Sequence, residues 1–166
     1  MPLTDSSLTL SVAQAVTATA FSTNTVDLGP SRDIGAGEEN HVLIRVGTAV
    51  TAAGAATVNF QIVTSANANL SSPTIIGQTD AIPKASLVAG ALIHIPLPAS
   101  FINNLGQRYL GLQFTVGTGP LTAGTFDVLI VRDVPKLSNT IYPSGFIDTS
   151  SNPSSPNGVM RGFSIR

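Results

Sequence analysis

The chain contains no cysteine and no tryptophan, and it carries little charge. Only 8 of its 166 residues are Lys or Arg and 9 are Asp or Glu. Charged residues therefore make up 10% of the chain, compared with about 25% in an average soluble domain. The absence of cysteine excludes disulfide bonds, thiolate catalysis and cysteine-ligated zinc. With a net charge of -1, the chain lacks the excess of basic residues by which proteins bind a nucleic acid or an anionic membrane surface.

Aromatic residues and long apolar runs are also scarce. Aromatics account for only 5% of the chain, so there are few rings on which a sugar could stack. No stretch approaches the roughly 20 apolar residues of a membrane helix, and the N-terminal segment MPLTDSSLTLSV has neither the basic start nor the apolar run of a secretory signal. We therefore expect no nucleic-acid or membrane partner. Low charge instead suits a subunit that buries surface against other proteins, because interface centres are depleted in charge.

Residues that could carry chemistry are few and scattered. The only histidines are His41, which opens an apolar stretch, and His94, which lies between Ile93 and Ile95 and should face away from them. The densest acidic region, residues 27–39, matches no ordered calcium-binding spacing. There is no G-x-S-x-G elbow, and the glycines of residues 117–119 precede no predicted helix. The sequence predicts no catalytic residue, cofactor or metal site, and hence a protein that is not an enzyme.

Apolar and polar residues alternate with a period of two between turn residues, which indicates β-strands. The clearest case is residues 57–63, where Val58, Phe60 and Ile62 share one face. Comparable inward rows are Leu110, Leu112, Phe114 and Val116; Phe126, Val128 and Ile130; Val42, Ile44 and Val46; and Ile93, Ile95 and Leu97. Weaker strands are expected at residues 8–12, 25–28 and 74–78. About eight antiparallel strands with one inward face each predict an all-β, jelly-roll β-sandwich over residues 1–134.

Residues 135–166 differ in composition from the rest of the chain. They are rich in Ser, Asn, Pro and Gly, with isolated apolar residues such as Tyr142, Phe146 and Phe163. Such a segment cannot form a core of its own. We interpret it as an extended C-terminal arm that lies on a neighbouring subunit. An exposed tail without fixed contacts is the alternative, because chain ends are often poorly ordered.

Several linked motifs resemble one known family. They are DSSLTLSVAQAVTATAFSTNTVDLG, RDIGAGE, TAAGAATVNFQIVTS, RYLGLQFTVGTGPLTAGTFDVLIV and YPSGF, in that order over residues 5–146. Together they resemble the Bbp16-like capsid cement (decoration) proteins of tailed bacteriophages. The resemblance implies a jelly-roll domain on the outer surface of an icosahedral head built from an HK97-like major capsid protein, made in the cytoplasm of a bacterial host. It does not extend to residues 148–166, where such proteins have usually ended.

The resulting prediction is a capsid cement protein that binds the outside of a phage head and stabilises contacts between major capsid protein subunits. Closed symmetry of the shell favours a homo-oligomer, either a dimer or a trimer. Residues 3–12 are a candidate for strand pairing with a partner. The predicted partner-interface residues are Leu3, Leu8, Leu10, Arg32, Asp33, Glu38, Glu39, Tyr142, Phe146 and Phe163.

Three alternatives remain open at this point. The main one is a jelly-roll binding module on the virion surface or a tail fibre that recognises carbohydrate or a receptor. A cupin-type enzyme would need a cluster of His and carboxylate ligands, which two isolated histidines do not supply. The third is a jelly-roll subunit that builds a shell by itself.

Overall fold

The computed structural model describes residues 5–29, 40–97 and 107–132. All of them belong to the first of two units into which the chain divides, Met1–Val134 and Pro135–Arg166. The predicted C-terminal arm lies outside the described residues, so its interpretation stays a prediction.

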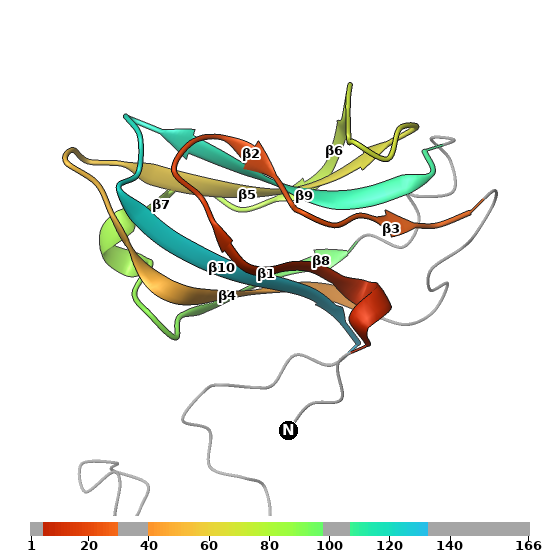
Figure 1. Ribbon diagram of the computed structural model, residues 1–166, viewed down its shortest axis with the longest axis horizontal. Helices are drawn as coiled ribbons and strands as arrows, with labels where there is room; N and C mark the ends of the chain where they lie inside the picture. Colours follow the sequence, from red (N-terminus) through yellow and green to blue (C-terminus); the bar gives the residue numbers. More distant parts are fainter. Residues whose placement is uncertain (1–4, 30–39, 98–106, 133–166) are drawn as a thin grey trace, which may run out of the picture. The chain divides into compact units, whose positions relative to one another are not determined.

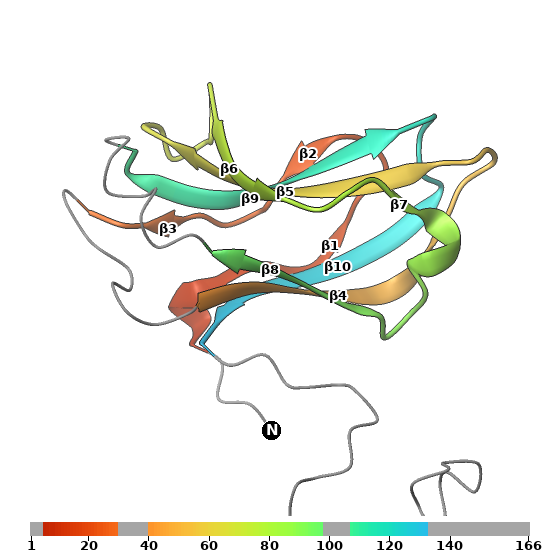
Figure 2. The same ribbon diagram turned by 180° about the vertical axis from the view of Figure 1, so that it is seen from behind.

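The described residues form two antiparallel sheets that lie one above the other (Figures 1 and 2). Sheet A has the order β1-β10-β4-β8. Its strands are β1 (Thr9–Ala15), β10 (Ala123–Val131), β4 (Asn40–Thr51) and β8 (Leu92–Leu97). Every pairing in the sheet is antiparallel.

Sheet B has the order β2-β9-β5-β6, with β3 also paired to β9 and β7 also paired to β5. Its strands are β2 (Ala20–Phe21), β3 (Val26–Asp27), β9 (Tyr109–Gly117), β5 (Thr57–Ser65), β6 (Thr74–Gln78) and β7 (Ile82–Pro83). Strands that are consecutive along the chain therefore mostly alternate between the two sheets. The prediction of an all-β sandwich is confirmed. We interpret this strand order as that of an eight-stranded jelly roll in which two strands of sheet B are each interrupted, one into β2 and β3 and the other into β6 and β7.

The core lies between the two sheets and is built from the inward rows that the alternation predicts. Its centre is a cluster of three fully buried phenylalanines, Phe60, Phe114 and Phe126. Their ring centroids are 5.9, 5.4 and 5.3 Å apart, and the two pairs that include Phe60 are edge-to-face. Aromatic pairs favour such tilted and edge-to-face geometry. Each ring comes from a different strand, so the cluster ties β5 and β9 of sheet B to β10 of sheet A.

Two short 3₁₀ helices, η1 (Ser6–Leu8) and η2 (Lys84–Ser86), are the helical segments of the described residues. Asp5 caps η1, because its Oδ1 accepts a hydrogen bond from the Ser7 amide at 2.9 Å. Hydrogen bonding to Ser7 favours the charged carboxylate and lowers the pKa of Asp5. Neither helix could cross a membrane.

Candidate interaction surface

The outer face of sheet A carries apolar side chains in register across three strands. Leu129 of β10 lies opposite Leu43 of β4, which in turn lies opposite His94 of β8. In the next row outward along β4, Val131 lies opposite His41. Leu43, Leu129 and Val131 are half-buried, and they alternate with neighbours that belong to the core. These side chains therefore point away from the core and form a second apolar layer.

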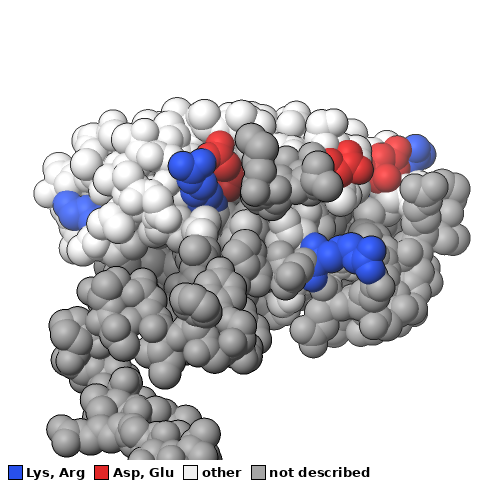
Figure 3. All heavy atoms as spheres, turned by 90° about the horizontal axis from the view of Figure 1, so that it is seen from below, with Lys and Arg blue, Asp and Glu red and all other residues white. Residues whose placement is uncertain are grey.

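This apolar layer extends to the edges of sheet A. Leu92 and Pro96 of β8 are exposed and point the same way as His94. Val12 of β1 is the most exposed large apolar side chain among the described residues, at 70%. Figure 3 looks toward this side of the sandwich, and the charged side chains of the described residues that are in view there lie in separate groups. We call the side chains of Leu43, Leu92, Leu129, Val131 and Pro96 the sheet A patch.

The ion pair of Arg45 and Asp127 adjoins the sheet A patch. Arg45 of β4 lies opposite Asp127 of β10, with 4.0 Å between the guanidinium and the carboxylate. The side chain of Arg45 is 62% exposed, whereas that of Asp127 is 28% exposed. Asp127 Oδ1 also accepts a hydrogen bond of 2.7 Å from the backbone amide of Ala13. The carboxylate thus holds the backbone of β1 while the guanidinium projects into solvent.

The Ala13 amide is available for that bond because β1 is irregular there. The pairing of β1 with β10 shifts register between Ser11 and Gln14, and Ala13 has a φ of 45°. A bulge of this kind leaves one residue without a ladder partner. The side chain of Gln14 links this bulge to the start of sheet B. It accepts a hydrogen bond from Ser11 Oγ at 2.6 Å and donates one to the Phe21 carbonyl of β2 at 2.7 Å.

The outer face of sheet B has the opposite character. Its central rows are amides and hydroxyls that bond to one another across the strands, whereas Ile75 at the β6 edge is apolar and 48% exposed. Gln61 donates to Gln78 at 2.8 Å and accepts from Thr115 Oγ1 at 2.8 Å, and Thr79 Oγ1 donates to Asn59 at 3.3 Å. These groups are already paired with one another or open to water, so sheet B presents a solvated polar face.

A small satellite cluster covers one end of sheet B. Leu70, in the loop after β5, is buried with a φ of 57° and packs over Gly111 of β9. A Cβ placed on Gly111 would fall well inside the contact distance of Leu70 Cδ1 and 3.1 Å from Ser22 Oγ. Ser22 Oγ also accepts a hydrogen bond of 3.1 Å from the Leu112 amide. Gly111 therefore allows the loop and the Ser22 segment to close against the sheet.

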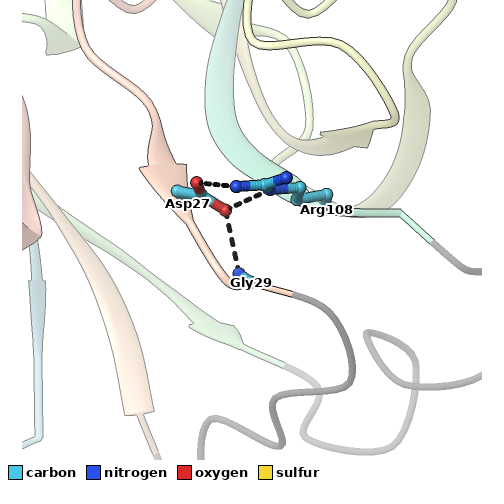
Figure 4. A network of polar contacts seen from close by, with 3 residues as sticks. All are labelled: Asp27, Gly29 and Arg108. Carbon is cyan, nitrogen blue, oxygen red and sulfur yellow. Dashed lines mark hydrogen bonds and ion pairs between the residues drawn. The ribbon is translucent and has the colours of Figure 1, made fainter.

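Asp27 and Arg108 join the end of β3 to the start of β9 (Figure 4). The guanidinium donates two hydrogen bonds of 2.7 Å to the carboxylate, and the Gly29 amide donates a third of 2.8 Å. The hydrogen bonds and charge of Asp27 raise the pKa of Arg108 further above its usual value. Both side chains are about half exposed, so the network orders a strand end more than it stabilises the fold.

Replacing Arg108 with glutamine should therefore have a local effect. We expect the Gly29 and Leu28 amides to exchange with deuterium several-fold faster, because the bidentate bond that holds β3 is lost, while the melting temperature does not change measurably. Hydrogen-exchange mass spectrometry of the full chain measures this. Arg45→Gln, a change to another exposed arginine, on sheet A, is the control and should leave both amides unaffected. Cooperative destabilisation of the whole sandwich by Arg108→Gln would contradict a local role.

The predicted interface residues fall into two groups. Leu3, Arg32, Asp33, Glu38, Glu39, Tyr142, Phe146 and Phe163 lie outside the described residues. Leu10 is fully buried in the core, and Leu8 is partly buried and packs against it. In this structure both leucines hold β1 onto the sandwich, so contact of Leu10 with a partner would require β1 to leave its own core.

The segment proposed for strand pairing is also engaged within its own chain. Residues 9–15 form β1, which pairs with β10. On its other side, the Leu10 carbonyl accepts a hydrogen bond of 2.9 Å from the Asn24 amide. The side chain of Thr23 donates to the same carbonyl at 3.4 Å. The segment at residues 23–24 thus covers the outer edge of β1.

The ionisable groups of the described residues do not converge on a reaction centre. His41 and His94 lie on the outer face of sheet A with ring centroids 6.0 Å apart. Within residues 5–29, 40–97 and 107–132, no group of three or more His, Cys, Asp or Glu side chains is placed to hold a metal ion. A shallow hollow beside β1 is lined by uncharged side chains: Ser6, Ser7, Thr9, Thr23, Asn24 and Thr25.

The described part of the chain thus defines an all-β sandwich domain whose most distinctive surface is a flat apolar sheet face. The model of the Bbp16 family matches residues 10–130, which span the sandwich from β1 to β10. The chain therefore belongs to the Bbp16 family, a family associated with phages. No curated protein matches the sequence.

Proposed function

We propose that this protein is a capsid cement protein, which binds the outer surface of a tailed-phage head and stabilises contacts between major capsid protein subunits. The observation that carries the proposal is the family match across residues 10–130. The match follows the whole sandwich and not one short motif, so the framework itself is what the chain shares with the family. A rigid two-sheet framework suits a protein that works by holding other subunits together.

Three features of the chain support this function over the alternatives. The core is continuous between the sheets and centred on three packed phenylalanine rings, which makes the domain a stiff support. Charge is sparse, at 10% of residues, as in surfaces that become buried in assemblies. One sheet face is apolar and the other polar, which gives the domain one side for contact and one for solvent.

Cementing requires no chemistry, only contacts that must break before shell subunits separate. Each contact can be weak when several act together, because the second binding event on one rigid assembly benefits from a high effective concentration. A homo-oligomer seated on a symmetry axis of the shell would provide such repeated contacts. A dimer or a trimer would serve equally well in this respect.

The proposal is tested by adding the purified full-length protein to phage heads that lack it. We expect saturable binding at fixed lattice positions, visible by electron cryomicroscopy, and heads that withstand several degrees more heating before they release DNA. Bovine serum albumin added at the same concentration is the control for crowding. Heads that gain neither bound density nor heat resistance would refute a cement function.

A carbohydrate- or receptor-binding module on the virion is the second candidate, and the polar hollow lined by Ser6, Asn24 and their neighbours is the observation that favours it. Hydroxyl and amide side chains can bond to sugar hydroxyls. The hollow has no aromatic side chain in its lining, so it lacks the apolar platform that sugar rings stack on. Binding of the isolated protein to a glycan array, without binding to heads, would favour this alternative.

A further inference from the structure

The two outer faces of the sandwich differ too strongly to have the same surroundings. Sheet B presents amides and hydroxyls that are bonded to one another, as in the Gln78–Gln61–Thr115 row. Sheet A presents Leu43, Leu129 and Val131 on its outer face. A contiguous apolar patch on an outer surface marks an interaction site in most soluble proteins. The difference therefore points to sheet A as the face that is covered in the assembled particle.

From the proposed function, on which this inference rests, we infer that the sheet A patch is the surface that contacts the capsid shell. We also infer that the shell surface beneath it combines apolar side chains with a carboxylate that binds Arg45. The inference names the docking face and the chemistry of its partner, neither of which the family match specifies.

The charged residues Arg45 and Asp127 beside the patch indicate the chemistry of the partner. Arg45 is an exposed cation beside the patch, at 62%, and its contact with Asp127 is long, at 4.0 Å. Asp127 is less exposed and already accepts the Ala13 amide at 2.7 Å. A guanidinium binds a carboxylate most strongly through two parallel hydrogen bonds, and Asp127 does not provide that geometry. A carboxylate from the partner would complete the coordination of Arg45 as the surrounding leucines are buried.

Two other possible occupants of the sheet A patch, a second copy of this face and the chain's own residues 135–166, fit less well. A second copy of this face would bring another Arg45 and another partly buried Asp127, so it would add a cation without an accessible carboxylate. The chain's own residues 135–166 contain Lys136, Arg161 and Arg166 but only one acidic side chain, Asp148. Their net charge is positive, which does not complement Arg45.

The size of the patch agrees with a repeated weak contact. Strands lie about 4.8 Å apart and rise about 3.3 Å per residue. The three strands of the patch, β10, β4 and β8, with six residues of β8 therefore span roughly 10 by 20 Å by these spacings. This area is well below the roughly 800 Å² per partner of a stable two-protein interface. Several such contacts on one shell, and not one contact alone, would hold the protein in place.

The test uses full-length variants in the head-binding assay. Leu43→Ser with Leu129→Ser changes a directly opposed pair on sheet A. The matched control, Gln61→Ser with Gln113→Ser, changes a directly opposed pair on sheet B. Arg45→Glu reverses the charge, and Arg45→Lys keeps it. Circular dichroism and thermal melting verify that each variant is folded.

We expect the sheet A double variant and Arg45→Glu each to bind heads at least about tenfold more weakly, which corresponds to about 1.4 kcal/mol of binding free energy. The sheet B control should bind like the unmodified protein, and Arg45→Lys should fall between. If the leucine variant does not fold, Arg45→Glu still decides, because its side chain is mostly exposed. Equal head binding by the folded sheet A variants and the unmodified protein would overturn the inference.

Two further readouts separate the other occupants. Loss of oligomers in sedimentation velocity, with head binding unchanged, would assign the patch to contact between copies and overturn the inference. Faster deuterium exchange of residues 135–166 in the leucine variant, again with head binding unchanged, would assign it to the chain's own C-terminal segment and overturn it as well. Failure of the unmodified protein to bind heads would instead refute the proposed function itself.

Discussion

Replacing Phe126 with alanine should lower the free energy of unfolding by about 3–5 kcal/mol, the usual cost of truncating a buried phenylalanine. Phe126 is fully buried and touches the ring cluster from the sheet A side, at 5.4 Å from Phe60 and 5.3 Å from Phe114. Removing it leaves a cavity between two sheets whose strands are fixed by their own hydrogen bonds. Because the sheets cannot close over that space, the cavity term adds to the lost burial of the ring.

Urea denaturation of the full chain, followed by circular dichroism, measures the change. Leu129→Ala on the same strand is the matched control, because Leu129 points outward from sheet A. It should cost only about 1 kcal/mol, because Leu129 is half-buried on the outer face and loses little burial. The denaturant slope should stay constant in both variants, since the surface exposed on unfolding is almost unchanged. A loss below about 1 kcal/mol for Phe126→Ala would contradict a central role of the ring cluster.

Replacing Gly111 with alanine should lower the free energy of unfolding by about 1–3 kcal/mol through overpacking. The new methyl group would clash with Leu70 Cδ1 and lie 3.1 Å from Ser22 Oγ. Leu70 is fully buried, so its side chain cannot simply swing into solvent. The loop after β5 would have to move away from sheet B, or the Ser22–Leu112 hydrogen bond would have to lengthen.

A double-mutant cycle with Leu70→Ala tests this explanation. Leu70→Ala removes the atoms that the new methyl group would meet, so the double variant should be more stable than the sum of the single effects by at least about 1 kcal/mol. Gly54→Ala is the control glycine. A Cβ there meets only the Thr118 carbonyl at 3.8 Å, so it should change stability by about 0.5 kcal/mol at most. Simple additivity of Gly111→Ala and Leu70→Ala would show that the clash is not the cause.

Period-two alternation was sufficient to predict the sandwich because each long strand buries one face. The rows headed by Val58, Leu110 and Phe126 all line the core, as expected. The eight predicted strands correspond to β1, β3, β4, β5, β6, β8, β9 and β10. The missed strands, β2 and β7, have two residues each. β3 is equally short, but it was predicted because Val26, Asp27 and Leu28 alternate in polarity, whereas β2 and β7 are defined only by their tertiary pairing.

The interaction surface was harder to predict because the outward-facing leucines lie within continuous apolar runs of the sequence. Leu43 lies between Val42 and Ile44, and Leu129 between Val128 and Ile130. In such runs the core-facing residues already account for the apolar pattern. Nothing in the local sequence shows that the residue between them faces outward and could contact a partner. Leu8 of η1 and Leu10 of β1 show the converse case, since both were predicted as interface residues and in this structure pack on the core.

The Leu70–Gly111 contact illustrates a third limit of local patterns. Leu70 follows a run of polar and small residues, and Gly111 lies between Leu110 and Leu112 on the opposite face of β9. Their contact depends on how the loop of residues 66–73 folds back over β9, which is a long-range event. Only the three-dimensional arrangement shows that the missing side chain at one position provides the space for the other.

The covered edge of β1 has a consequence for a protein whose proposed role places many copies close together. An open strand edge invites neighbouring molecules to add strands, and repeated addition leads to amyloid-like polymers. At β1 an incoming strand would first have to displace the Asn24 amide from the Leu10 carbonyl. Crowded copies can therefore sit side by side on a surface without β1 seeding aggregation among them.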